Sequence, residues 1–402
     1  MNGSLSYESL KTILLHTEAN LRIKMNQQMP KIRCADRIVP LRINYLNIDD
    51  CSTTINNSSY TFGIYRNFQT EDIPRLVKIW NDSCGDQYDL DQYGFEISSY
   101  SSPILPGDVS FREENHIVLP MDTDTVEQIY KAELNNGLKP DVHDYISFNL
   151  LPFHYRRNNI RPPYSSFIRF TLKQEKKKRV EHYSYDIKLF EAAKELNRII
   201  FDGRCRIQVN TFEMTGTGIV HRLPIGFKVS AKRMAIRLEH ISRVASIMES
   251  TSACLKKLEL VFMSKSFENL HHDVVRNAKK LLFQLEDFTV LSTALKNLPN
   301  EIIEIHFARR TPTAEQHYGF IQSWMLTERE IGSSYSFGLA EEKVGSRLLN
   351  LVRARSEITE QAERCVTIIK EERKRYEIIL KENERGKTER FLWFFEVSFL
   401  GV

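Results

Sequence analysis

The chain has no long apolar run: nowhere in its 402 residues do about 18 consecutive apolar residues occur, the minimum for a membrane-spanning helix. Its start, MNGSLSYESLKTILLH, has neither a basic region nor an apolar stretch of signal-peptide length. The six cysteines are scattered and form no CxxC pair, which is typical of a protein in a reducing compartment. These absences predict a cytoplasmic or nuclear protein that is neither secreted nor membrane-bound.

A strong excess of one charge is also missing. The 56 basic residues are nearly balanced by 52 acidic residues, which gives a formal net charge of +4. Nucleic-acid-binding proteins usually concentrate positive charge far more strongly, so we expect no nucleic-acid partner. The basic runs 176–179 and 373–375 stand beside glutamates and are interpreted as solvated ends of a hairpin or a helix. The length allows two or three domains, each with a sizeable core.

Complete motifs for a cofactor, a metal or a catalytic set are absent as well. TGTGIVHR, at 215–222, has two glycines of a dinucleotide loop but neither the third glycine nor a following helix. ERGKTER ends like a phosphate loop, yet Lys381 stands where the first glycine is needed. DLDQYGFE opens like a calcium loop, but its twelfth position is Tyr100 instead of a carboxylate. The sequence therefore predicts no cofactor, no metal site and no enzyme, with an unrecognised, distributed active site as the alternative.

Residues 1–40 are expected to form short helices. One helical stripe consists of Leu5, Leu10, Ile13 and Leu14, and a second consists of Leu21, Met25, Met29 and Ile32. Ser6 is the expected N-terminal cap of the first helix, because its side chain can accept a hydrogen bond from a backbone amide of the first turn. An interior proline removes a backbone donor and clashes with the preceding turn, so Pro30 is expected to split the second stretch into two helices.

Residues 41–185 are expected to form a β-rich module. LRINYLNI, from Leu41, alternates as a half-buried strand does, and the segments 52–55 and 60–66 predict a hairpin. From 67 to 163 the sequence is poor in helical pattern and rich in turn residues, with one helix expected at 123–135 and capped by Asp122. SFIRFTLK and RVEHYSYD predict a second hairpin.

Residues 186–363 open with a clear amphipathic helix, IKLFEAAKELNRIIF, and continue with short strand-like runs from Arg233, Lys256, Lys279 and Glu301. The equivalent positions in these runs are Met234, Leu258, Leu281 and Ile303. They are 24, 23 and 22 residues apart, within the period of leucine-rich repeats. Connectors such as SRVASIMES, TVLSTALKNLP and EQHYGFIQSWML are helix-like and long enough to join parallel strands. We expect an irregular, leucine-rich-repeat-like β/α array, with an ordinary α/β domain of coincidental spacing as the alternative.

The four strand runs are predicted to be neighbours, in sequence order, in one parallel sheet with the connecting helices on one side. Their inward positions are expected to be Ile236, Leu238, Leu258, Leu260, Leu281, Phe283, Ile303 and Ile305. Glu259 and Glu304 alternate with inward residues and are predicted to line an open face, the candidate substrate surface. Residues 364–402 predict an antiparallel meander that caps the array. The expected fold is therefore mixed, α+β or α/β.

Several strings, in this order, carry a family resemblance: SYESLKTILLH, IVPLRINYL, LDQYGFE, LPGDVSFR, RPPY, YDIKLFEAAKELN, HRLPIGFKV, LKNLPNEIIEIHF, REIGSSYSFG and CVTI. Together they resemble the nematode (Caenorhabditis-type) F-box C family, whose members carry an associated domain of unknown function. The resemblance spans nearly the whole chain. It implies a small N-terminal F-box, followed by a region that holds a protein substrate.

An F-box is a helical motif that docks on Skp1, the linker of a cullin-based ubiquitin ligase, so the resemblance implies a Skp1-like partner and an unidentified protein substrate. Mapped onto this sequence, the docking face consists of Leu10, Ile13, Leu14, Leu21 and Ile32. A docking helix needs such an apolar stripe. However, residues 6–8 read Ser-Tyr-Glu where F-boxes typically begin with leucine and proline. The same stripe would also pack the helices on the sheet, and an interaction protein without Skp1 binding is a further alternative.

Overall fold

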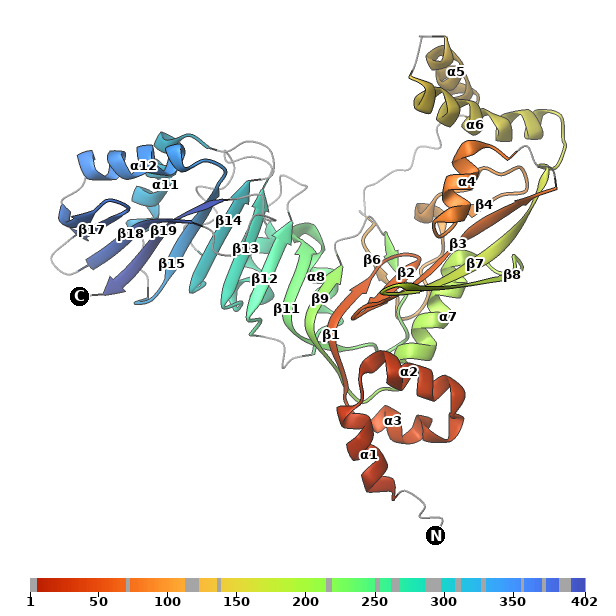
Figure 1. The fold of residues 1–402 in the computed structure, drawn as a ribbon, viewed down its shortest axis with the longest axis horizontal. Coiled ribbons are helices and arrows are strands. Elements are labelled where there is room, and N and C mark those ends of the chain that lie inside the picture. Colours follow the sequence, from red (N-terminus) through yellow and green to blue (C-terminus); the bar gives the residue numbers. More distant parts are fainter. Residues whose placement is uncertain are drawn as a thin grey trace. The chain divides into compact units, whose positions relative to one another are not determined.

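The computed structural model describes residues 6–69, 73–112, 123–135, 139–214, 219–249, 254–261, 268–285, 298–307, 312–326, 330–355, 358–370, 374–382 and 392–401. The fold is mixed α/β, with helices and a large mixed sheet (Figure 1). The chain divides into two compact units. The first unit comprises residues 1–207 and 216–227, and the second comprises residues 208–215 and 228–402.

The first unit begins with a cluster of short helices: α1 (Tyr7–His16), α2 (Ala19–Gln28), the 3-10 turn η1 (Pro30–Ile32) and α3 (Arg33–Ile38). The predicted cap is confirmed, because the Ser6 hydroxyl oxygen accepts a hydrogen bond of 3.1 Å from the amide of Ser9. The predicted effect of Pro30 is confirmed too, since α2 ends before it and a separate helix follows.

An antiparallel sheet follows, with the strand order β1-β2-β3-β7-β8. Its strands are β1 (Leu41–Ile48), β2 (Ser52–Ile55), β3 (Ser58–Phe68), β7 (Tyr164–Gln174) and β8 (Lys177–Ser184). Both predicted hairpins are therefore confirmed. Helix α7 (Leu189–Phe201) packs its apolar stripe on this sheet, where Leu189 and Ala193 lie in one core cluster with Ile64 and Ile168.

The segment between β3 and β7 contains more helix than the sequence predicted. The helix expected at 123–135 is present as α5 (Thr123–Leu134), while its expected cap, Asp122, lies outside the described residues. Two further helices, α4 (Arg75–Asp82) and α6 (Pro140–Arg157), contradict the expectation of a helix-poor segment. Pro140 occupies the first turn of α6, where a missing N–H costs nothing, so this proline starts a helix. Short strands β4 (Asp89–Leu90), β5 (Glu96–Ile97), β6 (Val109–Ser110) and β10 (Val220–His221) and the turn η2 (Ser99–Ser101) complete the unit.

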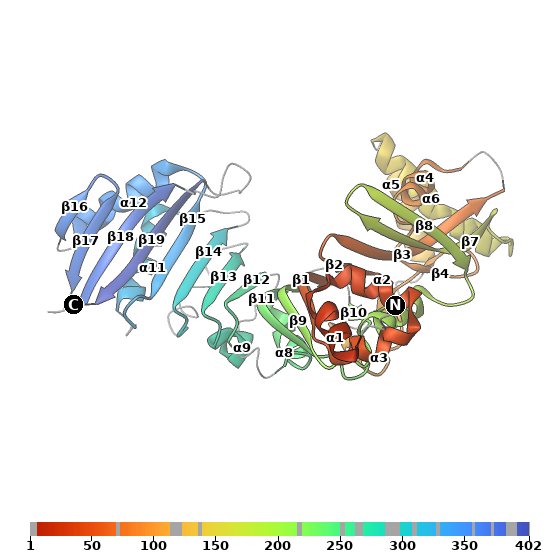
Figure 2. The ribbon, with the colours of Figure 1, turned by 60° about the horizontal axis from the view of Figure 1, so that its bottom comes forward.

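The second unit contains a sheet with the order β9-β11-β12-β13-β14-β15-β19-β18-β17-β16 (Figure 2). The strands β11 (Val229–Arg237), β12 (Lys257–Val261), β13 (Lys280–Leu285), β14 (Ile302–Phe307) and β15 (Ser334–Leu339) are parallel neighbours in sequence order. The register places Met234 opposite Leu258, Leu258 opposite Leu281, and Leu281 opposite Ile303. The predicted order and equivalence of the four runs are thus confirmed, and β15, which the sequence did not reveal, extends the array by one strand.

All eight predicted inward side chains are buried, each at most 1% exposed. Leu238, however, lies in a 3-10 turn after β11, and the register places Met234 and Ile236 opposite Leu258 and Leu260. Part of the cover comes from α11 (Ala314–Met325), whose Trp324 ring lies 5.7 Å from Tyr335 and whose Phe320 ring lies 5.7 Å from Phe337. The predicted connector EQHYGFIQSWML nearly coincides with this helix, and SRVASIMES overlaps α8 (Ile241–Ala245). The third connector, TVLSTALKNLP, lies largely outside the described residues.

The remaining elements of the unit are β9 (Ile207–Met214), η3 (Leu238–His240), η5 (Glu268–His271), α9 (Asp273–Arg276), α12 (Glu342–Arg355), β16 (Ile358–Ala362), β17 (Cys365–Lys370), β18 (Lys374–Glu382) and β19 (Trp393–Gly401). The predicted C-terminal meander is confirmed: β16 to β19 are antiparallel, and β19 pairs with β15. The last parallel strand, β15, is therefore paired with β19 of the meander and does not form an unpaired edge of the sheet.

Candidate functional site

The N-terminal helices share a small core of their own. Leu14, Ala35 and Val39 form its centre, with Leu10, Leu15, Met25 and Ile32 packed around them. Of the five residues predicted to dock on Skp1, Leu14 is fully buried, and Leu10 and Ile32 pack against its cluster. Ile13 and Leu21 are 46% and 51% exposed. The apolar stripe read from the sequence therefore divides into a core part and a surface part.

The exposed apolar side chains of this helical cluster are Tyr7, Ile13, Leu21, Met29 and Ile38, each between 44% and 53% exposed. Single exposed apolar residues are ordinary on protein surfaces, and these five lie within about thirty residues of chain. We call these five residues the helical docking surface.

A buried ion network holds the helical cluster in place. The Asp36 carboxylate is 0% exposed and lies 2.6 Å from the Arg22 guanidinium, on α2, and 2.7 Å from that of Arg204, which follows α7. Arg22 also donates to the backbone carbonyls of Val39 and Pro40, at 3.0 and 2.7 Å. Two helices and the chain after α7 are thus linked through one carboxylate that water does not reach.

Side chains of α2 also reach the sheet of the first unit. The Asn20 amide donates to the carbonyl of Ile55 at 3.0 Å and accepts from the Tyr60 hydroxyl at 3.2 Å. Glu18, just before α2, accepts a short hydrogen bond from Asn56 in the β2–β3 turn. The helical docking surface is therefore fixed on the sheet and presents its exposed residues from a rigid support.

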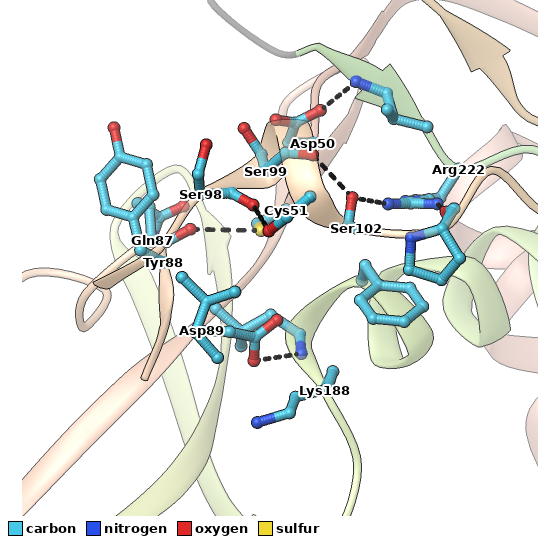
Figure 3. A pocket seen from close by; sticks show the side chains of 16 residues that line it. Asp50, Cys51, Gln87, Tyr88, Asp89, Ser98, Ser99, Ser102, Lys188 and Arg222 are labelled. Atoms are coloured by element: carbon cyan, nitrogen blue, oxygen red, sulfur yellow. Dashed lines mark hydrogen bonds between the residues drawn. The ribbon is translucent and has the colours of Figure 1, made fainter. Parts of the chain in front are cut away.

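A polar cleft lies elsewhere in the first unit (Figure 3). Two adjoining hollows of about 180 and 430 Å³ share six lining residues: Asp50, Cys51, Gln87, Tyr88, Ser98 and Ser99. The segments that line them come from the β1–β2 turn, the loops around β4 and β5, the start of α7 and β10. No sequence motif marks the cleft, because it forms only when these distant segments meet.

The carboxyl and thiol groups of the cleft are partly buried and hydrogen-bonded. The Asp50 carboxylate accepts hydrogen bonds from the amides of Ile219 and Val220, at 3.2 and 3.0 Å, although burial raises its pKa. Cys51 donates its S–H to the carbonyl of Gln87 at 3.6 Å, and burial together with nearby carboxylates raises the thiol pKa. The reactive thiolate is therefore disfavoured at neutral pH.

Other charged groups of the cleft hold its walls together. Asp89 accepts from the amide of Leu189 at 2.9 Å, and so ties β4 to the start of α7. The Arg222 guanidinium donates to the carbonyl of Pro103 and the carboxylate of Asp108, both at 2.7 Å. These bonds join two loops and one helix end around the cleft.

The predicted substrate residues Glu259 and Glu304 lie on the face of the second unit's sheet opposite the predicted inward row. This face is not open along their row, because Ala235, Leu282, Glu304 and Ser336 are each at most 9% exposed. The register aligns Ala235, Glu259, Leu282, Glu304 and Ser336 across five strands. Neither glutamate projects freely. Glu259 accepts from Lys257 at 3.0 Å and from Gln284, while Glu304, only 9% exposed, bonds to Lys280 and lies 2.8 Å from the His306 ring nitrogen.

Acid should destabilise the protein through Glu304. Burial alone would raise the pKa of this carboxyl, but its bonds to His306 and Lys280 outweigh burial and lower the pKa to about 2. A lowered folded-state pKa stabilises the fold above the unfolded value and loses that contribution as the pH falls from about 4.5 to about 2. The contribution amounts to roughly 3 kcal/mol at most, at 1.36 kcal/mol per pKa unit.

The measurement compares urea unfolding of the wild type and Glu304→Gln at a pH of about 6 and of about 3. At the higher pH the wild type should be clearly more stable than Glu304→Gln. At the lower pH the difference in stability between the two proteins should be smaller. A gap between the two proteins that does not change with pH would show that the carboxylate's ion pairs do not stabilise the fold.

Comparison with known proteins identifies one region. The family model described as Domain of unknown function (DUF3557) matches residues 188–341, from the start of α7 to just after β15, which is less than half of the chain. No curated protein and no solved structure matches the chain. Among the described residues, no helix is long and apolar enough to cross a membrane, and no group of three or more His, Cys, Asp or Glu side chains is placed to hold a metal ion.

Proposed function

We propose that this chain is a non-enzymatic, cytoplasmic or nuclear protein-binding protein that acts as the substrate-recognition adaptor of a Skp1–cullin-type ubiquitin ligase. Its α1–α3 segment would be an F-box-like motif of the nematode F-box C type. The parallel strands β11–β15 would be a leucine-rich-repeat-like array that holds the target protein. The observation that carries the proposal is the helical docking surface, in which exposed Ile13 and Leu21 stand on a separately packed three-helix core.

Two further observations support this function. The helical cluster is anchored on its sheet through Asn20 and Glu18, which supports the exposed apolar side chains that an adaptor would present to its linker. The cleft of the first unit, the most enzyme-like feature described, uses Asp50, Asp89 and Arg222 to join its own walls. An interaction protein that binds no Skp1 is the alternative, and the same experiment tests it.

The test is capture of recombinant Skp1 by the full chain, comparing the wild type with the double variant Ile13→Glu/Leu21→Glu. Each side chain is about half exposed, so the fold should tolerate glutamate, while a charge placed in an apolar interface should cost about 2 kcal/mol or more. Affinity should therefore fall by at least about 30-fold. Leu14→Glu is unsuitable because Leu14 is fully buried and its loss would unfold the helices.

The matched control is Ile104→Glu/Ile187→Glu, which alters two other half-exposed isoleucines of the first unit, at 53% and 48%. It should bind Skp1 like the wild type. Thermal melts should show both double variants folded. No binding by the wild type would remove the ubiquitin-ligase assignment and leave an interaction protein of another kind. Equal binding by all three proteins would show that Skp1 does not dock on the helical docking surface.

A further inference from the structure

The larger hollow of the polar cleft has an acidic lining. Its volume is about 430 Å³, within the range of sites that hold small organic ligands, and three carboxylates line it: Asp49, Asp50 and Glu96. Among the described residues that line it, none is a lysine, an arginine or a histidine. We call this space the acidic hollow. Its other lining residues are Cys51, Ser52, Gln87, Tyr88, Ser98, Ser99, Tyr100 and Ile219.

The charge of the acidic hollow is not neutralised within the protein. In the described part of the chain, none of the three carboxylates forms an ion pair. The nearest available guanidinium, that of Arg222 in the adjoining smaller hollow, is held by Asp108 at 2.7 Å. A hollow that is lined by one sign of charge and enclosed by poorly polarisable walls concentrates ions of the opposite sign.

The negative charge also acts on neutral groups of the acidic hollow. Burial raises the pKa of the Tyr88 phenol, and the carboxylates of Glu96 and Asp50 raise it further. Burial raises the pKa of the Cys51 thiol as well, and the carboxylate of Asp50 adds to this effect. Both shifts oppose the formation of one more negative charge. The acidic hollow therefore disfavours an anionic ligand and favours a cationic one.

An organic cation suits this lining better than a metal ion does. Among the described residues, no group of three or more His, Cys, Asp or Glu side chains is placed to hold a metal ion. The rings of Tyr88 and Tyr100 also line the hollow, and aromatic faces attract ammonium and guanidinium groups. Tyr88, Ser98 and Asp50 come from three separate segments and lie around one space in Figure 3. The hydroxyl of Ser98 and the amide oxygen of Gln87 can accept further N–H bonds from such a ligand.

We propose that the acidic hollow binds an organic cation, a primary ammonium or a guanidinium group, between the carboxylates of Asp49, Asp50 and Glu96 and the rings of Tyr88 and Tyr100. Two sources supply this chemistry: the side chain of a lysine or arginine in a protein segment, and a free amine. Identifying such a segment as part of a ubiquitination target rests on the proposed function, whereas binding at the acidic hollow does not.

The test is isothermal titration calorimetry of the full chain with three probes. They are the peptide acetyl-Gly-Gly-Arg-Gly-Gly-amide, the same peptide with citrulline in place of arginine, and agmatine. Citrulline has the shape of arginine without its charge. At least one cationic probe should bind at least about tenfold more tightly than the citrulline peptide, because only a cation pairs with the carboxylates. Tighter binding of the arginine peptide assigns the site to a protein segment, and tighter binding of agmatine assigns it to a free amine.

The variant Asp49→Asn/Glu96→Gln removes two of the three charges. The asparagine oxygen can still accept the hydrogen bond that Asp49 accepts from the Asp50 amide at 2.9 Å. Binding of the cationic probe should weaken at least about tenfold. The matched control, Glu8→Gln/Asp82→Asn, removes two exposed carboxylates elsewhere in the first unit and should bind the probe within about twofold of the wild type. Thermal melts should show both variants folded.

If neither cationic probe binds the wild type more tightly than the citrulline peptide, the proposal is wrong, and this comparison needs no variant. Unchanged binding by Asp49→Asn/Glu96→Gln would overturn it as well, and so would tighter binding of calcium alone than of either cationic probe. Skp1 capture separates the two proposals. Asp49→Asn/Glu96→Gln should still capture Skp1, and Ile13→Glu/Leu21→Glu should still bind the cationic probe, so either site can fail without the other.

Discussion

Replacing Asp36 with alanine is expected to destabilise the first unit by about 3 to 5 kcal/mol, because it leaves two buried guanidinium groups without their counter-charge. Arg22 is 1% exposed and the side chain of Arg204 is 3% exposed, so water cannot replace the carboxylate. The Asn26 amide, which also donates to Asp36, would lose its acceptor. Hydrogen exchange of amides in residues 6–69 should report the loss, since exchange follows local opening free energies.

The control for this substitution is Glu195→Ala. Glu195 and Arg198 form an ion pair of 2.7 Å on α7 with both side chains about half exposed, and such surface pairs are worth below about 1 kcal/mol. Asp36→Ala should also weaken capture of any partner of the helical docking surface, although Asp36 itself is inaccessible. A loss of stability no greater than that of Glu195→Ala would mean that the carboxylate does not hold the helical cluster together.

The sequence could not predict this network. Arg22, Asp36 and Arg204 are far apart in the sequence, and the sequence does not show which charged residues form ion pairs in the fold. The sequence showed the apolar stripe of α1. Because this stripe is broad enough to face both the neighbouring helices and solvent, the sequence does not determine which of its residues are buried. Packing decided that Leu14 is core and Ile13 is surface.

The parallel array, by contrast, could be predicted in detail. In β12 and at Ile303 and Ile305 of β14, apolar residues alternate with others, and a slip of one residue would turn this apolar set to the wrong face, so the pattern favours one register. Long crossovers then require parallel neighbours. Strand β15 escaped prediction because SYSFGL contains serines and a glycine where the other runs have aliphatic residues. Helix α6 escaped because its two prolines, Pro140 and Pro152, suggested turns.

The cleft of the first unit could not be predicted from the sequence. Its lining residues come from positions near 50, 88, 100, 188 and 220, and none of these segments carries a spacing that chemistry demands. Serines and tyrosines in turns are common in any protein. Only the folded chain shows that they share a hollow.

Phe283→Ala is expected to cost the second unit about 3 to 5 kcal/mol, the usual range for removing a buried aromatic ring. Phe283 is 0% exposed and stands in register between Leu260 and Ile305 in the inward row. The neighbouring strands are fixed by their own pairings, so the sheet cannot collapse fully into the space left behind. The measurement is urea unfolding, with hydrogen exchange of β13 and its neighbours to show that the loss is located there.

The next residue, Gln284, is the matched control because it belongs to the same strand but to the opposite face. Its side chain is half buried and donates to Glu259, so Gln284→Ala should cost only about 1 kcal/mol, the net value of one hydrogen bond. If Phe283 lies on the core face of β13 and Gln284 on the opposite face, the loss of stability should be several times larger for Phe283→Ala than for Gln284→Ala. Similar losses at both positions would show that the two faces of β13 are not divided into core and surface. A larger loss at Gln284 would mean that the face of Glu259 and Glu304 is the better-packed face of β13.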